Sequence, residues 1–294
     1  MQNKEKNRGF SSLILKIIAI ITMTIDHIGS FMIFNDGYTD NVSYILKLIG
    51  RLSLPLIIFI LLESLRHTKS IGKFLLRLGF FSIATYAFFV VFQKLFEINL
   101  VFNGNIFFTL FLLSLSYVIL KSKHKWPIVF IALFFILSAI FNIEYSKNLI
   151  QIKDDIFFYI NGIYPQYELM APLIFFLALI FYSIYDSCCF KSLNKDYQSF
   201  NEYKATRKYQ KSRNFIYIIV LIFIILICYG FTYIKDTDLN IITNFAIQTW
   251  MILATIPIAL YNGKLGYKKK GIKFFFYLYY PLHLLIIFIV SLLF

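Results

Sequence analysis

The first long apolar segment of the chain, residues 13–34, reads LILKIIAIITMTIDHIGSFMIF and carries Asp26 and His27 side by side. A largely apolar helix of this length can cross the hydrocarbon core of a bilayer. An acidic side chain near the centre of such a helix costs about 2.5 to 3.5 kcal/mol on insertion scales. Ionisable groups at that depth usually face a bundle interior, a cavity or a partner. The segment therefore predicts a membrane helix whose Asp-His pair points into protein.

The composition extends this prediction to the whole chain. Hydrophobic residues make up 59% and charged residues 15%, with a mean hydropathy of +0.72, whereas soluble domains are about 45–50% apolar and about 25% charged. We therefore expect an all-α, polytopic helical bundle, forming a single domain over residues 1–294, with about nine membrane spans. The expected spans are residues 12–34, 44–66, 74–97, 105–121, 127–142, 168–186, 214–234, 242–260 and 272–293.

The distribution of basic residues predicts the orientation of these spans. If the N-terminus is cytoplasmic and the spans alternate, the inner segments hold 22 Lys and Arg residues and the outer segments hold four. The inner segments are 4–8, 66–77, 121–125, 191–213 and 264–273, and the outer cations are Lys94, Lys147, Lys153 and Lys235. Because such an excess marks the cytoplasmic side, we predict that the N-terminus is inside and the C-terminus outside.

The formal net charge of +14 then follows mostly from orientation. No basic module with stacking aromatic residues is visible, so nucleic-acid binding is not indicated, whereas the same lysines can contact anionic lipid head groups. The cytoplasmic segment 187–213 is too short and polar to form a domain and is interpreted as a connector. Cys188, Cys189 and Cys228 lack the spacing of metal ligands, so no metal is expected.

The depths of three ionisable residues predict that they meet. With a rise of about 1.5 Å per residue, His27 lies in the outer half of the first span and Arg51 about 10 Å below the outer start of the second. Asp26 can then pair with Arg51, leaving His27 as a bystander in a polar clasp. Alternatively, Asp26 orients His27 as a general base, and Arg51 faces a substrate anion or oxyanion.

Other polar residues leave similar alternatives open. Glu63 precedes Arg66 by one turn, which suits a helix-surface ion pair or a cytoplasmic vestibule that attracts a phosphorylated cofactor. His283 follows Tyr280 and Pro281 within the last span. It is either a satisfied core residue or part of a cavity lined by tyrosines.

Two short segments beside the spans contain candidate binding residues. Asn103 and Asn105 flank Gly104 at the outer entry of the fourth span and can cap a helix or bind an acceptor. Asn262 and Lys264 follow the eighth span in a glycine-containing stretch, which is either a simple turn or a phosphate contact.

Five blocks of sequence resemble the TraX family. The segments carrying Asp-His-Ile-Gly, Arg-Leu-x-x-Pro-Leu and Tyr-Pro-Leu-His are together the most specific, and the region from about 120 to 240 carries little signature. The blocks occur in order at residues 15–29, 50–68, 105–110, 261–266 and 275–283.

The resemblance implies a multi-pass acetyltransferase of a bacterial inner or plasma membrane. The family's namesake acetylates the N-terminus of conjugative pilin, and related transmembrane acyltransferases use cytoplasmic acetyl-CoA and an early-helix histidine, which His27 matches. Acetyl-CoA is thus the expected co-substrate, and Glu63, Arg66, Tyr280 and His283 are candidates for binding it, together with Asn262 and Lys264. The acceptor is a peptide N-terminus, a glycan or a small molecule, and a homodimer is considered.

A second class of function uses the same residues. In a transporter or flippase, Asp26, His27 and Arg51 would form a proton or substrate pathway. The odd number of spans, the basic cytoplasmic rim and the lack of an internal repeat of the kind many transporters show favour the acetyltransferase.

Overall fold

The computed structural model describes residues 9–36, 41–96, 104–146, 169–192, 200–232, 245–266 and 271–291. These residues fold into helices and short connections, which confirms the all-helical class. An isolated β-type bridge joins Phe10 and Tyr261. The helices are α1 (Ser12–Asp36), α2 (Asn41–Gly50), α3 (Ser53–His67), α4 (Ile71–Phe96), α5 (Ile106–Lys121), α6 (Ile128–Ser146), α8 (Met170–Ser192), α9 (Phe200–Lys204), α10 (Arg207–Thr232), α12 (Phe245–Gln248), the 3-10 helix η1 (Thr249–Ala254), α13 (Thr255–Ala259) and α14 (Gly271–Ser291).

Five helical stretches of the described chain are long and apolar enough to cross a membrane. They are Ser12–Ser30, Asn41–His67, Ile71–Val91, Met170–Cys189 and Arg207–Gly230. Four shorter apolar helices coincide with the remaining expected spans, at Ile106–Lys121, Ile128–Ile140, Thr249–Ala259 and Phe274–Ile287. The chain is thus a helical protein of membrane type, while nine crossings and their orientation stay predictions.

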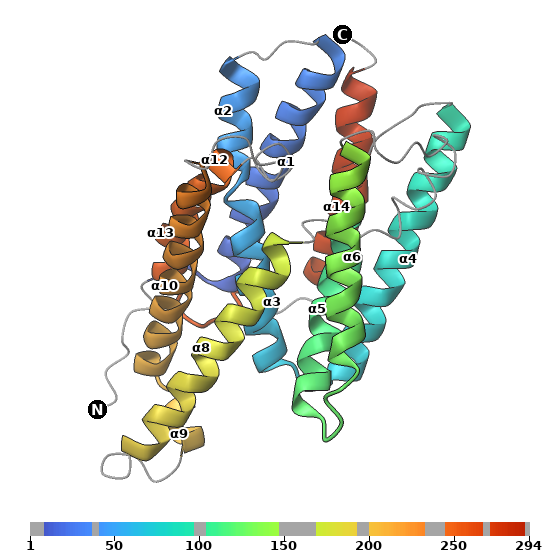
Figure 1. The fold of residues 1–294 in the computed structure, drawn as a ribbon. Helices are drawn as coiled ribbons and strands as arrows, with labels where there is room; N and C mark the ends of the chain where they lie inside the picture. The colour runs from blue at the N-terminus through green and yellow to red at the C-terminus, as the bar shows by residue number, and fades with distance from the viewer. Residues whose placement is uncertain are drawn as a thin grey trace.

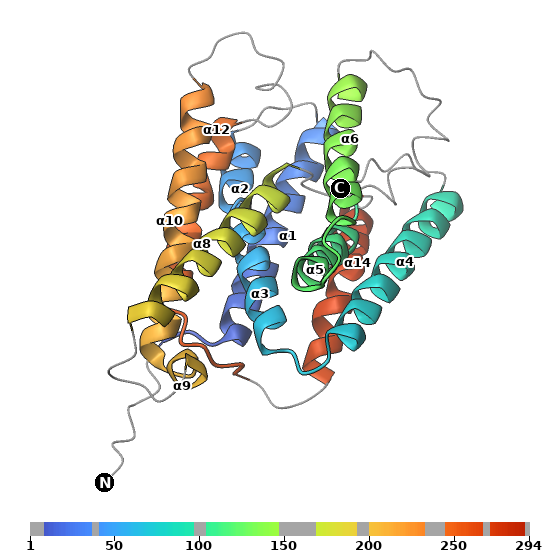
Figure 2. The ribbon, with the colours of Figure 1, turned by 60° about the horizontal axis from the view of Figure 1, so that its bottom comes forward.

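The helices form two groups that meet along the middle of the molecule. Figures 1 and 2 show α1, α2, α3, α8, α10 and α12 on one side and α4, α5, α6 and α14 on the other, and Figure 1 shows α13 beside α10 in the first group. Contacts of α1 with α14, and of α3 and α8 with α5, join the groups.

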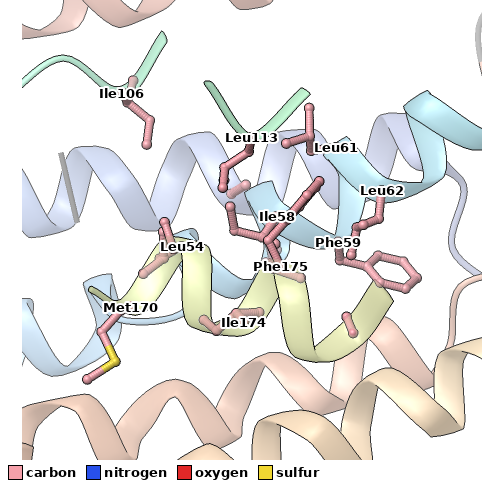
Figure 3. Close-up of a cluster of buried hydrophobic side chains, with 14 of the residues drawn as sticks. Leu54, Ile58, Phe59, Leu61, Leu62, Ile106, Leu113, Met170, Ile174 and Phe175 are labelled. Atoms are coloured by element: carbon pink, nitrogen blue, oxygen red, sulfur yellow. The ribbon is translucent and has the colours of Figure 1, made fainter. Parts of the chain in front are cut away.

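Helix α3 is the most enclosed element because it packs against both groups. Leu54, Ile58 and Phe59 of α3 belong to one buried cluster with Leu113 of α5 and Phe175 of α8 (Figure 3). Burying a side chain of this size stabilises the fold by about 1.5 to 3 kcal/mol. Any polar group on the buried face of α3 is consequently held inside the protein.

The predicted second span is one apolar stretch with a break at Arg51 and Leu52, where α2 ends and α3 begins. Proline lacks an N–H and its ring clashes with the carbonyl four residues earlier. Pro55 therefore cannot continue a helix that includes Arg51, but it is tolerated in the first turn of α3. The break places the Arg51 side chain between two helix ends.

The segment predicted as a connector, residues 187–213, is largely helical where it is described. Helix α8 runs to Ser192, α9 covers Phe200–Lys204, and α10 already begins at Arg207. Helix α9, the junction of α3 with α4 and the turn between α5 and α6 lie at one end of the bundle (Figure 1), which we call the α9 end. Basic segments that were predicted to be cytoplasmic converge there.

The start of α1 is tied to the segment that follows α13. Phe10 N donates to the carbonyl of Leu260 at 2.7 Å, and Asn262 N donates to the carbonyl of Phe10 at 2.9 Å. Ser12 N continues the pairing to the carbonyl of Lys264 at 2.7 Å. The bond from Ser12 satisfies an N–H group at the first residue of α1, which has no partner within the helix, and the other two hold Phe10 against the segment after α13.

Candidate functional site

Asp26 and Arg51 form a buried ion pair between α1 and the break after α2. Arg51 Nη2 donates to Asp26 Oδ1, and Arg51 Nε donates to the carbonyl of Lys47 at 3.3 Å. Close helix approach makes this pair possible, since a Cβ on Gly50 would collide with Asp26. The structure thus brings together the two residues that the depth argument paired.

His27 faces a different partner from Asp26. Consecutive residues of an α-helix are separated by about 100° around the axis, so the carboxylate of Asp26 is directed to α2 while the imidazole of His27 is directed to α14. His27 Nδ1 lies 3.1 Å from His283 Nε2, and the ring centroids are 5.0 Å apart. The hydrogen-bonding role expected of Asp26 is taken here by His283, 256 residues away.

The carbonyl oxygen of Tyr279 determines which nitrogens of His27 and His283 carry protons. His283 Nδ1 lies 2.9 Å from the carbonyl oxygen of Tyr279, which can only accept, so Nδ1 carries the proton. A neutral His283 then presents an unprotonated Nε2, to which Nδ1–H of His27 donates. The basic nitrogen of the pair is consequently His27 Nε2. His27 is half-buried, whereas His283 is buried.

Aromatic side chains fix the orientation of the two imidazoles. The Tyr279 ring stacks on the His283 ring at 5.1 Å, and the Tyr279 hydroxyl is hydrogen-bonded to Thr24 Oγ1 of α1 at 2.7 Å. Tyr280 is buried beside both histidines, 6.5 Å from His27 and 5.7 Å from His283 between ring centroids. Tyr280 and His283, both predicted as cofactor-binding residues, therefore belong to the surroundings of His27.

Asn105 precedes α5 and holds the start of this helix, whose Phe107 packs against a neighbour of the histidine pair. Its side-chain oxygen accepts from the N–H groups of Phe107 and Phe108, and its Nδ2 donates to the carbonyl of Ser82 in α4 at 2.9 Å. Phe107 in turn packs edge-on against Tyr280 at 5.4 Å. Asn105 is thus a helix cap two contacts from the histidines, and Asn103 lies outside the described residues.

A second buried polar cluster lies at the α9 end of α3, α8 and α10. Glu63 of α3 and Arg213 of α10 are only 4% and 6% exposed. Arg213 Nε lies 3.3 Å from Glu63 Oε1, and Arg66 Nη2 lies 3.4 Å from Glu63 Oε2. The predicted pair of Glu63 with Arg66 exists, but it is part of an interior cluster and not an isolated surface pair.

Amide side chains extend this cluster to the segment after α13. Arg66 Nη2 donates to Gln210 Oε1 at 2.6 Å, and Gln210 Nε2 donates to Asn214 Oδ1 at 2.9 Å. Asn214 Nδ2 then donates to the carbonyl of Tyr261 at 2.8 Å. Burial, followed by the negative charge of Glu63, raises the pKa of Tyr261 above its ordinary value, so its hydroxyl stays protonated at neutral pH.

The glycine-containing turn beside Tyr261 is packed against the same amides. Gly263 has a φ of +77°, which other residues rarely adopt, and a Cβ there would lie 3.2 Å from Gln210. Asn262 Nδ2 donates to the carbonyl of Gly9 at 3.0 Å, and Asn262 Oδ1 accepts from the N–H of Lys264 at 3.0 Å. The turn that holds Asn262 and Lys264 thus packs against Gln210, which contacts Arg66, and the side chain of Asn262 is engaged by contacts that shape the turn.

The sequence interpretation missed Arg213, which it counted among the loop cations, and it did not single out Tyr182, Gln210 or Asn214. A signal was present in the spacing of Gln210, Arg213, Asn214 and Tyr217, which recur at i, i+3, i+4 and i+7. This spacing places polar groups on one helix face. Within the described ranges, no three His, Cys, Asp or Glu side chains gather as a metal site.

These features define the class of the protein: a helical membrane-type protein with two ionisable clusters inside its bundle. The family model described as TraX protein matches residues 11–193, and the chain belongs to the TraX family. It is 26% identical to the probable fimbrial assembly protein FimC, serogroup H1, of Dichelobacter nodosus, in an alignment that covers 95% of each chain. No solved structure matches the chain.

Proposed function

We propose that this protein is an integral membrane acetyltransferase that moves an acetyl group from cytoplasmic acetyl-CoA to an amine or hydroxyl acceptor. The observation that carries the proposal is the hydrogen-bonded pair of His27 and His283 inside a TraX-family bundle. A half-buried imidazole that is held by a second histidine and has one basic nitrogen available is the kind of group that general-base catalysis needs.

The chemistry balances with His27 Nε2 as the base. The acceptor nitrogen or oxygen attacks the thioester carbonyl carbon, its proton moves to His27 Nε2, and the C–S bond breaks to release CoA. The proton then passes from His27 to the leaving thiolate. While His27 is protonated, its Nδ1–H bond to His283 Nε2 becomes charge-assisted and therefore stronger.

The remaining residues predicted for the site belong to two regions, one beside His27 and one at the α9 end. Asp26 and Arg51 neutralise each other and hold α1 against α2, so the proposal gives them a positioning role. Glu63, Arg66 and Lys264 at the α9 end are the candidates for contact with the phosphorylated part of the donor. His27 is 15 residues beyond the start of α1, about 22 Å along the helix axis, a distance that the long pantetheine arm would have to cover.

A peptide amine is the first acceptor to test, because the aligned relative is a probable fimbrial assembly protein. The purified full chain in detergent is incubated with labelled acetyl-CoA and peptides that have free N-termini, with hydroxyl acceptors as a second set. We expect His27→Ala to lower the transfer rate by about 10²- to 10⁴-fold with little change in thermal unfolding. If the native chain releases no CoA with any of these acceptors, the enzyme proposal fails.

Two variants of His283 test its part in the same assay. His283→Phe removes the acceptor of the His27 Nδ1–H bond, and we expect a slower rate and an altered pH dependence. His283→Gln supplies an amide oxygen in its place and should recover part of the rate. Equal rates for the native chain and His283→Phe would show that the pair has no role in transfer.

A further inference from the structure

The cluster of Glu63, Arg66 and Arg213 holds more positive than negative charge in the interior. Two guanidinium groups share one carboxylate, and the nearby Asp186 is engaged by the Tyr209 hydroxyl at 2.7 Å and by Lys204 at 3.6 Å. His67 Nε2 lies 3.6 Å from Glu63 on the exposed side. An uncompensated buried charge is costly unless a partner neutralises it.

The same cluster contains polar atoms whose hydrogen bonds are unmade. Of the four buried side-chain atoms without a hydrogen-bond partner among the described residues, three are Glu63 Oε2, Arg66 Nη1 and Tyr182 Oη. The guanidinium carbon of Arg213 lies 3.6 Å from the centre of the Tyr182 ring, and Tyr182 interacts electrostatically with Glu63 and Arg66. Buried groups in this condition are rare and call for an explanation, such as strain, a catalytic role, or a water or ion that satisfies them.

One bound anion could both accept hydrogen bonds from the unsatisfied donors and balance the excess positive charge. Arg66 Nη1 and the Tyr182 hydroxyl both have a proton to donate, and an anion would accept both while opposing the second guanidinium. Arginine is the residue best suited to phosphate, because its planar fork matches the oxygens. The fork of Arg66 is held by Gln210, and its side chain keeps 20% exposure, which connects the cluster to the α9 end.

We propose that Arg66, Arg213 and Tyr182 form a buried phosphate-binding site at the α9 end of the bundle. Arg66 Nη1 and the Tyr182 hydroxyl donate to the phosphate oxygens, and Arg213, fixed between Glu63 and the Tyr182 ring, supplies the balancing charge. The phosphate comes from CoA, in which case the site rests on the proposed function, or from an anionic phospholipid. Both sources present the same group.

Tyr182→Phe tests the site because it removes only the unsatisfied hydroxyl and keeps the ring under Arg213. Tyr217→Phe is the matched control, since Tyr217 is a fully buried tyrosine of α10 whose hydroxyl donates to the carbonyl of Pro55 at 2.7 Å. Thermal unfolding of the full chain in neutral detergent is measured with CoA, dephospho-CoA, inorganic phosphate or phosphatidylglycerol, with phosphatidylcholine as the uncharged comparison.

For the native chain we expect at least one of CoA and phosphatidylglycerol to raise Tm by several degrees. Tyr182→Phe should leave the ligand-free Tm unchanged or higher, because it deletes a polar group that has no partner. Its affinity for the same probe should fall about 10- to 100-fold, as expected for a lost hydrogen bond to a charged group. Tyr217→Phe should do the reverse, with a lower ligand-free Tm and unchanged affinity.

The outcomes separate this site from the acetyltransferase proposal. Stabilisation by phosphatidylglycerol alone assigns the site to lipid, and stabilisation by CoA without any acetyl transfer supports the site while the proposed function fails. If no phosphate-bearing probe stabilises the native chain, or if Tyr182→Phe binds as tightly as the native chain, the proposal is overturned and water satisfies these atoms.

Discussion

The two buried clusters of this protein differ in how completely their charged and polar groups are paired. In the histidine region, Asp26 has one ion-pair partner within the described chain, Arg51, and His27 and His283 satisfy each other. In the α9-end cluster, two guanidinium groups and His67 lie close to Glu63, and three buried polar atoms have no hydrogen-bond partner among the described residues. The first region is internally balanced, and the second has capacity for an additional group.

This difference bears on what each region can do. A balanced set of polar groups with one basic nitrogen left over is suited to holding and moving a proton, because its geometry is fixed before a substrate arrives. A cluster with excess positive charge is suited to binding, because an anion gains the interactions that the free protein lacks. The chain thus separates the groups proposed for chemistry, on α1 and α14, from those proposed for recognition, on α3, α8 and α10.

The largest effect on stability is expected from removing the single partner in the histidine region. Arg51→Met leaves Asp26 buried without an ion pair and should lower the free energy of unfolding by about 3–5 kcal/mol. Arg213→Met should cost less, about 1–3 kcal/mol, because Glu63 keeps Arg66 and His67. Chemical unfolding of the variants in detergent gives both values, with Asp26→Asn/Arg51→Met expected to recover part of the first loss. Equal losses of unfolding free energy for Arg51→Met and Arg213→Met would show that the two clusters do not differ in how their carboxylates are paired.

A smaller effect is expected from Gly50, whose missing side chain lets α2 approach α1. Gly50→Ala should lower the free energy of unfolding by about 1–3 kcal/mol, as overpacking does elsewhere, because the new methyl group displaces Asp26 from Arg51. Gly72→Ala is the matched control, since nothing lies within 4 Å of its Cβ position. We expect its stability to be unchanged or slightly higher, as for a helix residue that gains propensity. Similar losses for both variants would show that close approach at Gly50 is unimportant.

The smallest effect is expected at the helix cap that supports the histidine region. Asn105→Ala should cost about 1 kcal/mol through the lost cap of α5, while Asn105→Ser keeps a capping oxygen and should cost less. Thermal unfolding measures both variants. Because the α9-end cluster is on other helices, the affinity of either variant for CoA or phosphatidylglycerol should equal that of the native chain, and a changed affinity would show that the two regions are coupled.

The helices were largely predictable from sequence because apolar runs of about 20 residues have few other stable arrangements in a membrane. The expected first span, 12–34, compares with α1 at Ser12–Asp36, and the expected last span, 272–293, compares with α14 at Gly271–Ser291. The interruption at Arg51 and the early start of α10 at Arg207 were not predicted. Hydropathy kept Arg51 inside one continuous span, because it does not register the effect of Pro55 on the preceding turn. It assigned residues 207–213 to a connector because they are polar and their buried partners lie far away in the sequence.

The site was predictable only where its members are close in sequence. Asp26 and Arg51 are on neighbouring antiparallel segments, so the helical rise alone brings their depths together. His27 and His283 are far apart in the chain, and their contact follows from the packing of α1 against α14. In the same way, Arg213 meets Glu63 because α10 packs near α3 across α8.

The sequence by itself therefore determined the membrane class, the positions of the helices, the family and the presence of expensive polar groups in apolar segments. Hydropathy and helical rise are local properties, and they act through residues near one another along the chain. Only the tertiary structure decided which polar groups meet. Pairing of His27 with His283, and the unequal sharing of Glu63 by its cations, depend on which helices become neighbours, and that is settled by packing of the whole bundle.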